Sequence, residues 1–324
     1  MKYKKQEKYP PMENSHAILK DKTVAVVGLG GLGSHSAAYA ARMGIGTIIL
    51  IDDDVVEETN LPRQGLYTQR DSEDNLLKAN VAAERLKMIN PDVHIQKYVL
   101  RLTSENVSEL LEGVDVVLDG TDNLATRYII NDYCFAEDIP WVYASATAGI
   151  GTVSNFIPGK TPCFRCVFGD ETEEDNASCD INGVILPALT MTTSIQVTEA
   201  LKILLDKDPS FEEIRYNIWT REESSVDISI YLDEECRCQK KQFLKKEMGS
   251  TRMYMICNGD SIQVHTTFSL SEAESKMNHW GFCISRKNDM LVEATTGENQ
   301  RIVAFKTGKM VFYHIDKHTI QTIL

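Results

Sequence analysis

Short apolar stretches alternate with longer stretches of helical periodicity over the first 150 residues, and this pattern predicts strands and helices in turn. Taken together the predicted strands are largely apolar, which is typical of a sheet covered on both faces. Because strands that alternate with helices form parallel sheets, we expect a three-layer α/β domain with a mostly parallel sheet. The expected strands are 24–27, 47–51, 94–98, 114–118 and 141–144, and the expected helices are 34–43, 76–89, 104–111 and 124–136.

The pattern changes after Gly149. It predicts a strand at 151–157, a long helix at 187–205 that a proline opens, and a hairpin of 213–219 with 226–232. A polar run near 243–252 indicates a boundary, so we expect one domain over residues 1–244 and a small α+β C-terminal module over 245–324. Within the module we expect a strand at 253–257, a helix at 270–280 and a strand at 309–315.

A glycine-rich motif follows the first strand and precedes a helix, which is the context that G-x-G-x-x-G requires. Its glycines allow a tight turn and let a phosphate approach backbone N–H groups at the positive end of the helix. Asp52 ends the second strand, where a carboxylate accepts hydrogen bonds from ribose hydroxyls. Together they predict a nucleotide site in a Rossmann-like fold; a glycine turn without a ligand is the alternative. The glycines are Gly28, Gly30, Gly31 and Gly33.

Two cations and a carboxylate follow this motif. Two positive charges suit a triphosphate, whose developing charge they neutralise, and an aspartate at the carboxyl end of a strand suits Mg²⁺. A nicotinamide dehydrogenase would instead need a hydride-transfer site, which we do not find. The alternative is that the cations are solvated surface charges and the aspartate is a turn residue. The segments are Asn60-Leu-Pro-Arg63-Gln64, then Lys78, then Asp119-Gly-Thr-Asp122-Asn123.

Two close pairs of cysteines lie about 70 residues apart, Cys163 with Cys166 and Cys236 with Cys238. Four thiolates suit a tetrahedral zinc ion, and such a site is structural because no position is left for water. Four unrelated buried cysteines, or a redox C-x-x-C pair, are the alternatives.

The other cysteines are spread along the chain. Cys179 lies in a polar loop, where it is either a reactive, sulfur-carrying thiol or an inert residue. Cys134, Cys257 and Cys283 fall on predicted helices and strands, and we expect them in the core.

Composition narrows the class of protein. Of 324 residues, 43% are hydrophobic and 25% charged, and the formal net charge is −13, which argues against a nucleic-acid partner. From Lys245 onward the charge is +2 and before it −15. No apolar run reaches the roughly 20 residues of a membrane helix, and the N-terminus lacks the apolar core of a signal peptide. We therefore expect a cytoplasmic protein without membrane attachment, in which clustered cysteines indicate metal or sulfur chemistry.

These motifs resemble those of the E1-like ThiF/MoeB/HesA adenylyltransferases, which activate sulfur-carrier proteins, over about residues 1–240. The resemblance implies that ATP and a ubiquitin-like (β-grasp) protein ending in Gly-Gly meet above the sheet, and that the terminal carboxylate attacks the α-phosphate. It implies ATP, Mg²⁺ and Zn²⁺ as cofactors, a homodimer, and a separate sulfur donor such as a cysteine desulfurase or sulfurtransferase. The matching motifs are 28–33, Asp52, 60–64, Lys78, Ile89-Asn-Pro91, 119–123, Cys163-Phe-Arg-Cys166 and Cys179.

The resemblance also implies roles for individual residues. Asp52 holds the ribose, Gly31 faces phosphate, and Asp122 takes Mg²⁺. The expected nucleotide-binding residues are Gly28, Gly30, Gly31, Gly33, Asp52, Asn60, Arg63, Gln64, Lys78, Asp122 and Asn123. The expected catalytic residues are Arg63, Lys78, Asp122 and Cys179.

Three features depart from the family pattern. The usual N-terminal Arg-Tyr-x-Arg-Gln is replaced by Lys2-Tyr3-Lys4-Lys5-Gln6, where lysine keeps the charge but lacks the bidentate fork. The second cysteine pair is C-x-C, and the C-terminal module lacks a cysteine followed six residues later by arginine, so it is not an evident rhodanese sulfurtransferase. The alternatives are adenylation of a modified tRNA base or a peptide, and a non-catalytic, zinc-stabilised dimeric scaffold.

Overall fold

The computed structural model describes residues 2–169, 183–233, 235–236, 240–241, 253–255, 261–266, 268–297 and 299–323. The chain divides into two compact units, Met1–Lys245 and Lys246–Leu324. Each unit has a sheet of its own.

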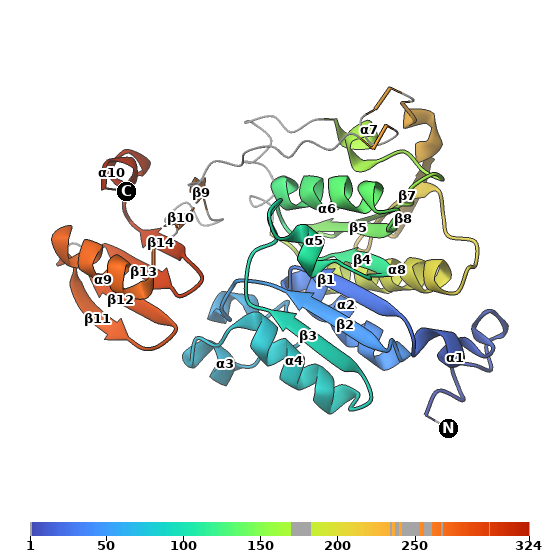
Figure 1. Ribbon diagram of the computed structural model, residues 1–324, viewed down its shortest axis with the longest axis horizontal. Helices are drawn as coiled ribbons and strands as arrows, with labels where there is room; N and C mark the ends of the chain where they lie inside the picture. The colour runs from blue at the N-terminus through green and yellow to red at the C-terminus, as the bar shows by residue number, and fades with distance from the viewer. Residues whose placement is uncertain are drawn as a thin grey trace. The chain divides into compact units, whose positions relative to one another are not determined.

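The first unit is built on an eight-stranded sheet of order β3-β2-β1-β4-β5-β6-β7-β8 (Figure 1). The strands from β3 to β5 in this order pair parallel, whereas β6, β7 and β8 add antiparallel neighbours at one edge. The expected mostly parallel α/β sheet is therefore confirmed. The strands are β1 Thr23–Val27, β2 Thr47–Ile51, β3 His94–Tyr98, β4 Val116–Asp119, β5 Trp141–Thr147, β6 Ile150–Phe156, β7 Glu212–Asn217 and β8 Glu222–Asp227.

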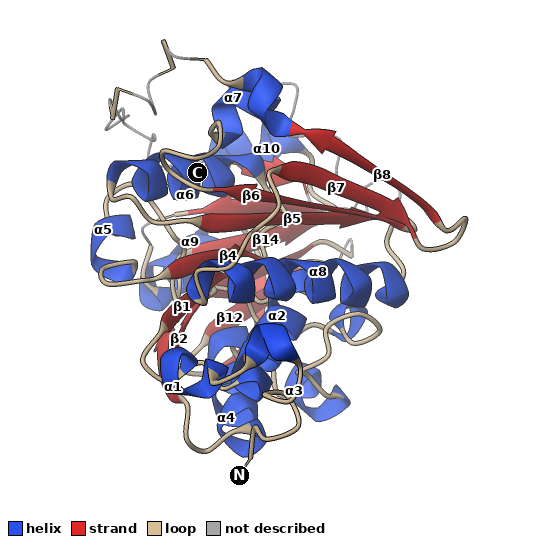
Figure 2. Ribbon diagram, turned by 90° about the vertical axis from the view of Figure 1, so that its right-hand side faces the viewer, coloured by secondary structure: helices blue, strands red, loops and turns tan. Residues whose placement is uncertain are grey.

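Helices cover both faces of this sheet (Figure 2). One face packs against α2, α4 and α8, and the other against α5, α6 and α7. The α-helices are α1 Ser15–Leu19, α2 Gly31–Met43, α3 Gln69–Glu73, α4 Lys78–Ile89, α5 Val107–Leu110, α6 Leu124–Ala136, α7 Phe164–Phe168 and α8 Leu186–Leu204. The 3-10 helices are η1 Pro10–Met12, η2 Glu58–Asn60 and η4 Ile228–Tyr231.

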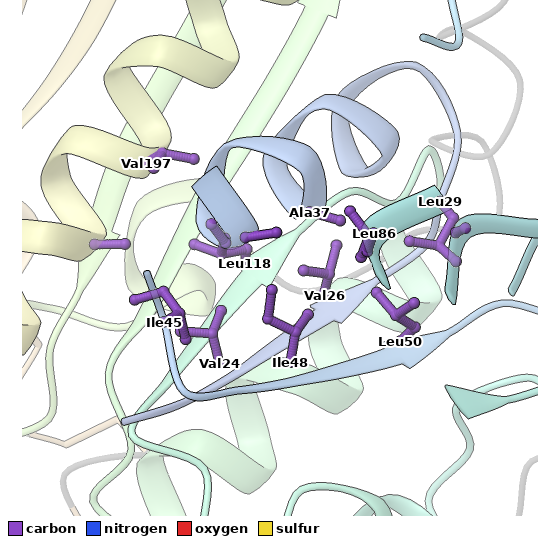
Figure 3. Close-up of a cluster of buried hydrophobic side chains, with 14 of the residues drawn as sticks. Val24, Val26, Leu29, Ala37, Ile45, Ile48, Leu50, Leu86, Leu118 and Val197 are labelled. Carbon is purple, nitrogen blue, oxygen red and sulfur yellow. The ribbon is translucent and has the colours of Figure 1, made fainter. Parts of the chain in front are cut away.

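Alternate residues of each central strand enter two separate cores. Val24 and Val26 of β1 lie in the core beneath α2, where Figure 3 shows them beside Ile48 and Ala37. Ala25 and its alternating neighbours lie in the core on the opposite face. Since the central strands are buried on both sides, their sequences are continuously apolar rather than alternating.

The observed elements follow the expected ones closely, with two corrections. The helix expected at 104–111 is only one turn, α5. The second hairpin strand lies at Glu222–Asp227 rather than 226–232, and η4 follows it. This strand is at the sheet edge with every residue exposed, and all its residues except Val226 are polar. The prediction instead placed the strand on the more apolar residues that follow, which form η4.

The described residues of the second unit form a six-stranded antiparallel sheet of order β11-β12-β13-β14-β10-β9 and two helices, as expected of a small α+β module. Its core gathers Val264, Met277, Ile302 and Phe312. The elements are β9 Met253–Met255, β10 Ser261–His265, α9 Leu270–His279, β11 Cys283–Lys287, β12 Leu291–Thr295, β13 Arg301–Phe305, β14 Lys309–Tyr313 and α10 Lys317–Ile323.

The expectation that three cysteines lie in the core has a mixed outcome. Cys134 is fully buried, as expected. Cys283 is exposed, because β11 is an edge strand and this residue faces solvent, so that expectation was wrong. Cys257 lies outside the described residues.

No helix within the described part of the chain combines the length and apolar character that crossing a membrane requires.

Candidate functional site

The glycine motif forms a turn between β1 and α2 in which backbone meets backbone. Gly28 has a φ of +81°, and a Cβ atom there would lie 2.7 Å from the carbonyl oxygen of Gly120, after β4. A Cβ on Gly33 would lie 1.8 Å from the carbonyl oxygen of Gly28. These glycines let the carboxyl ends of two neighbouring parallel strands, β1 and β4, approach each other. Ligands of such folds bind outside the carboxyl ends of the strands.

The remaining glycines of the motif open helix α2. Gly30 is its N-cap and Gly31 its first residue, and no side chain caps this end. The positive end of a 13-residue helix thus carries backbone N–H groups that suit an anion. A Cβ on Gly30 would meet only the Gln64 side chain, at 3.8 Å. Gln64 is buried and its Oε1 has no hydrogen-bond partner among the described residues, so the site holds a polar group suited to a ligand.

Asp52 lies just after β2 with its carboxylate directed at the glycine turn. Its Oδ2 accepts a hydrogen bond from the backbone N–H of Leu29 at 2.6 Å, and its Oδ1 accepts one from the N–H of Asp54 at 2.8 Å. Burial raises the pKa of this carboxyl to about 7, against the opposing effect of nearby Lys78. The carboxylate therefore supports the turn as well as standing where a ribose is expected.

Lys78 begins helix α4, and its ammonium enters the same site. The side chain is buried, and its Nζ lies 3.1 Å from Oδ2 of Asp54. Burial alone would lower the pKa of Lys78, but Asp54 and Asp52 raise it above the ordinary value. The lysine remains charged and is suited to pair with phosphate oxygens.

Asn60 and Arg63 lie on and just after η2. Asn60 is buried, and its Oδ1 accepts a hydrogen bond from the N–H of Glu57 at 3.2 Å. The Arg63 guanidinium donates to the Thr59 carbonyl at 2.7 Å at the surface, and the Arg63 carbonyl lies 3.2 Å from Nε2 of His35 on α2. This segment is thus attached to α2 while its guanidinium lies at the surface.

Asp122 and Asn123 follow β4 but have different surroundings. Asp122 is exposed, and Asn123 caps helix α6 by accepting a hydrogen bond from the N–H of Thr126 at 2.9 Å. An exposed carboxylate oxygen is a ligand type that Mg²⁺ takes, so Asp122 fits the role expected of it.

Sequence reasoning missed a buried ion pair below these residues. Arg127 Nε donates to Oδ2 of Asp119 at 2.8 Å, and its Nη2 donates to the Thr121 carbonyl at 2.8 Å. Both side chains are at most 5% exposed. The pair fixes the loop that carries Asp122. An arginine eight residues after an aspartate, on the inner side of a predicted helix, was the available signal.

Three of the four expected metal ligands come together. Cys163 Sγ lies 3.7 Å from Cys166 Sγ and 3.6 Å from Cys236 Sγ, and all three sulfurs lie within 4.8 Å of one another. Tetrahedral zinc with Zn–S bonds of about 2.3 Å requires sulfurs about 3.8 Å apart, so this cluster fits zinc. Cys238 and Cys179 lie outside the described residues.

Comparison with known proteins gives several similar sequences. A profile of the ThiF family matches residues 5–238. The chain is 30% identical over 320 residues to the sulfur carrier protein ThiS adenylyltransferase of Bacillus subtilis, covering 96% of this chain and 94% of that protein. It is 38% identical over 198 residues to the Escherichia coli protein of the same name, covering 61% and 78%. It is also 38% identical over 190 residues to the SAMP-activating enzyme E1 of Haloferax volcanii, covering 58% and 69%.

Solved structures share the fold. The structure of E. coli MccB with ATP has a TM-score of 0.59 and 23% identity, covering 66% of each chain. The structure of PaaA has a TM-score of 0.60 and 21% identity, covering 70% of this chain and 72% of that one. At these identities the likeness concerns the fold alone.

Proposed function

Because the chain belongs to the ThiF family, we propose that it is an adenylyltransferase that uses ATP to activate the C-terminal Gly-Gly carboxylate of a ubiquitin-like sulfur-carrier protein. The observation that carries this proposal is the match along 96% of the chain to a ThiS adenylyltransferase. The glycine turn, Asp52 and Lys78, which come together at one end of the sheet, support it with a site suited to ATP.

The reaction needs alignment and charge neutralisation more than proton transfer. The carrier carboxylate is already a nucleophile: its oxygen forms a bond to the α-phosphorus, the bond from that phosphorus to the bridging oxygen breaks, and pyrophosphate leaves. Asp52 accepts from the ribose, and the N–H groups at the start of α2, with Gln64, surround phosphate. Asn60, Arg63 and Lys78 contact the triphosphate and stabilise the charge that develops on it.

Asp122 is the residue that we propose would hold Mg²⁺, and the ion would supply positive charge to the phosphates. Its exposure leaves the carboxylate accessible, and the Arg127–Asp119 pair holds its loop in place. Asn123 supports this position by capping α6.

The cysteine cluster is proposed as a structural zinc site. Cys163, Cys166 and Cys236 supply three thiolates, and Cys238 the fourth. The cluster joins the C-x-x-C turn of α7 to the chain that follows η4. Cysteine thiols stay reduced and available to a metal in a reducing compartment, which favours the cytoplasm.

We further propose that the protein acts as a homodimer whose N-terminal lysines serve the neighbouring subunit. Tyr3 is buried, and its hydroxyl accepts a hydrogen bond from Nδ2 of Asn90 at 3.0 Å. Gln6 donates to the Met43 carbonyl at 3.2 Å. With these two residues anchored, Lys4 and Lys5 between them are exposed and free of the core.

The acyl adenylate is proposed to react with the persulfide of a separate donor, a cysteine desulfurase or sulfurtransferase, which displaces AMP and forms an acyl disulfide. A thiol then attacks the donor sulfur of that disulfide, which releases the carrier thiocarboxylate and leaves a new disulfide between the thiol and the donor. Cys179 is proposed as a thiol that takes part in this step. Full thiocarboxylate formation by Cys179→Ser would remove that residue from the sulfur step without affecting the adenylation proposal.

The test is ATP–pyrophosphate exchange by the purified protein with Gly-Gly-ending β-grasp carriers from the same cell. Exchange that depends on one carrier, and that the same carrier lacking its last glycine does not support, is the expected result. No exchange with any carrier, in protein that binds ATP, would refute a sulfur carrier as the substrate and favour a peptide or a modified tRNA base.

A further inference from the structure

Leu29, in the glycine turn, has both of its backbone polar groups held by side chains from elsewhere in the fold. Its N–H donates to Asp52 Oδ2 at 2.6 Å, and its carbonyl accepts from the Tyr67 hydroxyl at 2.8 Å. The Leu29 side chain is itself fully buried and packs in the core beneath α2 (Figure 3). Two successive peptide planes of the turn are therefore fixed from outside it.

The bond from Tyr67 has a consequence for the neighbouring residue. A trans peptide is planar, so its C=O and N–H point in opposite directions. Holding the Leu29 carbonyl toward Tyr67 directs the N–H of Gly30 the other way. Without that bond this peptide would be less restrained, because Gly30 has no Cβ to restrict its φ. Gly30 is the N-cap of α2, where the first N–H groups of an anion site belong.

Tyr67 also belongs to the segment that carries Asn60, Arg63 and Gln64. Its ring is buried, and its N–H donates to the Gln64 carbonyl at 3.4 Å. Burial, together with the carboxylates of Asp52 and Asp54, raises the pKa of Tyr67 well above its ordinary value. The hydroxyl therefore stays protonated and remains a hydrogen-bond donor.

We propose that Tyr67 is a positioning residue for ATP: its hydroxyl fixes the Leu29–Gly30 peptide so that the N–H of Gly30 is directed at phosphate. It also joins the 60–67 segment to the glycine turn, so that the cation of Arg63 and the helix start meet the same nucleotide. This role rests on the proposed use of ATP. Tyr67 itself touches the turn and not the reacting atoms.

The test compares Tyr67→Phe with Tyr216→Phe. Each substitution removes one buried hydroxyl that donates to a backbone carbonyl, that of Leu29 at 2.8 Å or that of Ala188 at 3.0 Å. Tyr67→Phe is expected to weaken ATP binding, measured without carrier, about fivefold, the effect of one ordinary hydrogen bond. In the exchange assay it should raise KM for ATP by the same factor and leave kcat nearly unchanged, because the contact serves bound ATP and transition state alike. Tyr216→Phe should change neither.

Amide hydrogen exchange gives a second measurement that needs no nucleotide. The backbone N–H groups of residues 29–31 should exchange faster in Tyr67→Phe and at the wild-type rate in Tyr216→Phe. Wild-type protein that binds ATP while Tyr67→Phe binds it equally well would overturn the role of Tyr67 alone. Equal weakening by both variants would overturn it too, as a general stability effect. Wild-type protein that binds no ATP would refute the proposed function and this role with it.

Discussion

The ammonium of Lys78 lies 3.1 Å from the carboxylate of Asp54, and the lysine side chain is only 7% exposed. The cation proposed for the triphosphate is therefore already held in place, with its charge balanced, before any nucleotide binds. Such a side chain needs little rearrangement when phosphate arrives, and preorganised charge of this kind is an effective contribution to catalysis.

Replacing this lysine should abolish most activity. Lys78→Gln is expected to lower the rate of carrier-dependent ATP–pyrophosphate exchange about 100-fold to 1000-fold, the usual cost of removing one preorganised donor. Lys22→Gln is the matched control, because Lys22 pairs with Asp115 at 2.8 Å before β1, at the opposite end of that strand from the glycine turn. Its exchange rate should stay at the wild-type value. A Lys78→Gln enzyme of normal rate would exclude the lysine from catalysis.

ATP affinity should depend on the ionisation of Asp52. Its pKa of about 7 means that the carboxyl goes from about one-tenth ionised at pH 6 to nine-tenths at pH 8. Ribose hydroxyls donate to the ionised form, so the Kd for ATP should fall as pH rises through 7 and level off above 8. Asp52→Asn should bind more weakly, and its pH dependence should keep only the part that ATP itself contributes. The same slope in both proteins, measured by titration calorimetry, would disprove this.

The loss of the Asp122 carboxylate should lower activity without lowering the stability of the fold. Because the side chain is exposed, Asp122→Ala is expected to change the unfolding free energy by less than about 0.5 kcal/mol while lowering exchange at least about 100-fold. Asp122→Asn should need more Mg²⁺ for half-maximal rate. Asp208→Ala, another exposed aspartate, should behave as wild type in both assays. Unchanged exchange in Asp122→Ala would remove this residue from the mechanism.

The cysteine cluster should contain one zinc ion per chain. Cys163→Ser is expected to lose the metal, as measured by elemental analysis, and to unfold at a lower temperature, because ligand binding contributes to folding. Cys134→Ala removes a buried sulfur that is outside the cluster, so it should keep full zinc content. A chelator should lower the Tm of the wild type and have no further effect on Cys163→Ser. Metal-free wild-type protein of unchanged Tm would contradict a structural zinc.

Breaking the Arg127–Asp119 pair should be costly. Arg127→Met leaves a fully buried carboxylate without its cation, for which we expect a loss of about 3–5 kcal/mol in urea unfolding. Arg85→Met breaks the pair with Asp71, but Arg85 is 35% exposed, and its loss should be below about 1 kcal/mol. If the two variants had the same free energy of unfolding, burial would not explain the contribution of the Arg127–Asp119 pair to stability.

Periodicity and motif context predicted much of the fold. The bounds of β2 follow directly from the residues, because it is an apolar run between polar turns. The bounds of β3 and α6 also coincide with the expected ranges, although both elements mix polar and apolar residues. The antiparallel direction of β6 to β8 could not be predicted, because the sequence of a strand does not indicate whether its neighbour runs parallel. Edge strands were the hardest to predict: Val226 is the one apolar residue of β8 and is exposed, and Cys283 on β11 faces solvent.

The residues of the candidate site also include some that the sequence predicted and some that it did not. Gly28, Asp52 and Lys78 were predicted from motif and spacing, and the structure brings their neighbourhoods together. The hydrogen bond from Tyr67 was not predicted, because it joins two segments 38 residues apart whose approach only the fold determines. The ion pair of Arg127 spans eight residues, so a signal for it was present in the sequence and was missed. Sequence spacing predicts which groups lie on the same helix or strand. It does not predict contacts between segments that are far apart in the chain.

The contact between the glycine turn and Gly120 limits how this protein can evolve. A Cβ on Gly28 or Gly33 would meet carbonyl oxygens, and one on Gly120 would lie 2.4 Å from that of Gly28. Since the obstructing atoms are main chain, no substitution at a second position removes them. No second substitution can therefore compensate for the loss of glycine at these three positions. Substitution is open at positions such as Gly30, where the nearest atom belongs to a side chain that can itself be replaced.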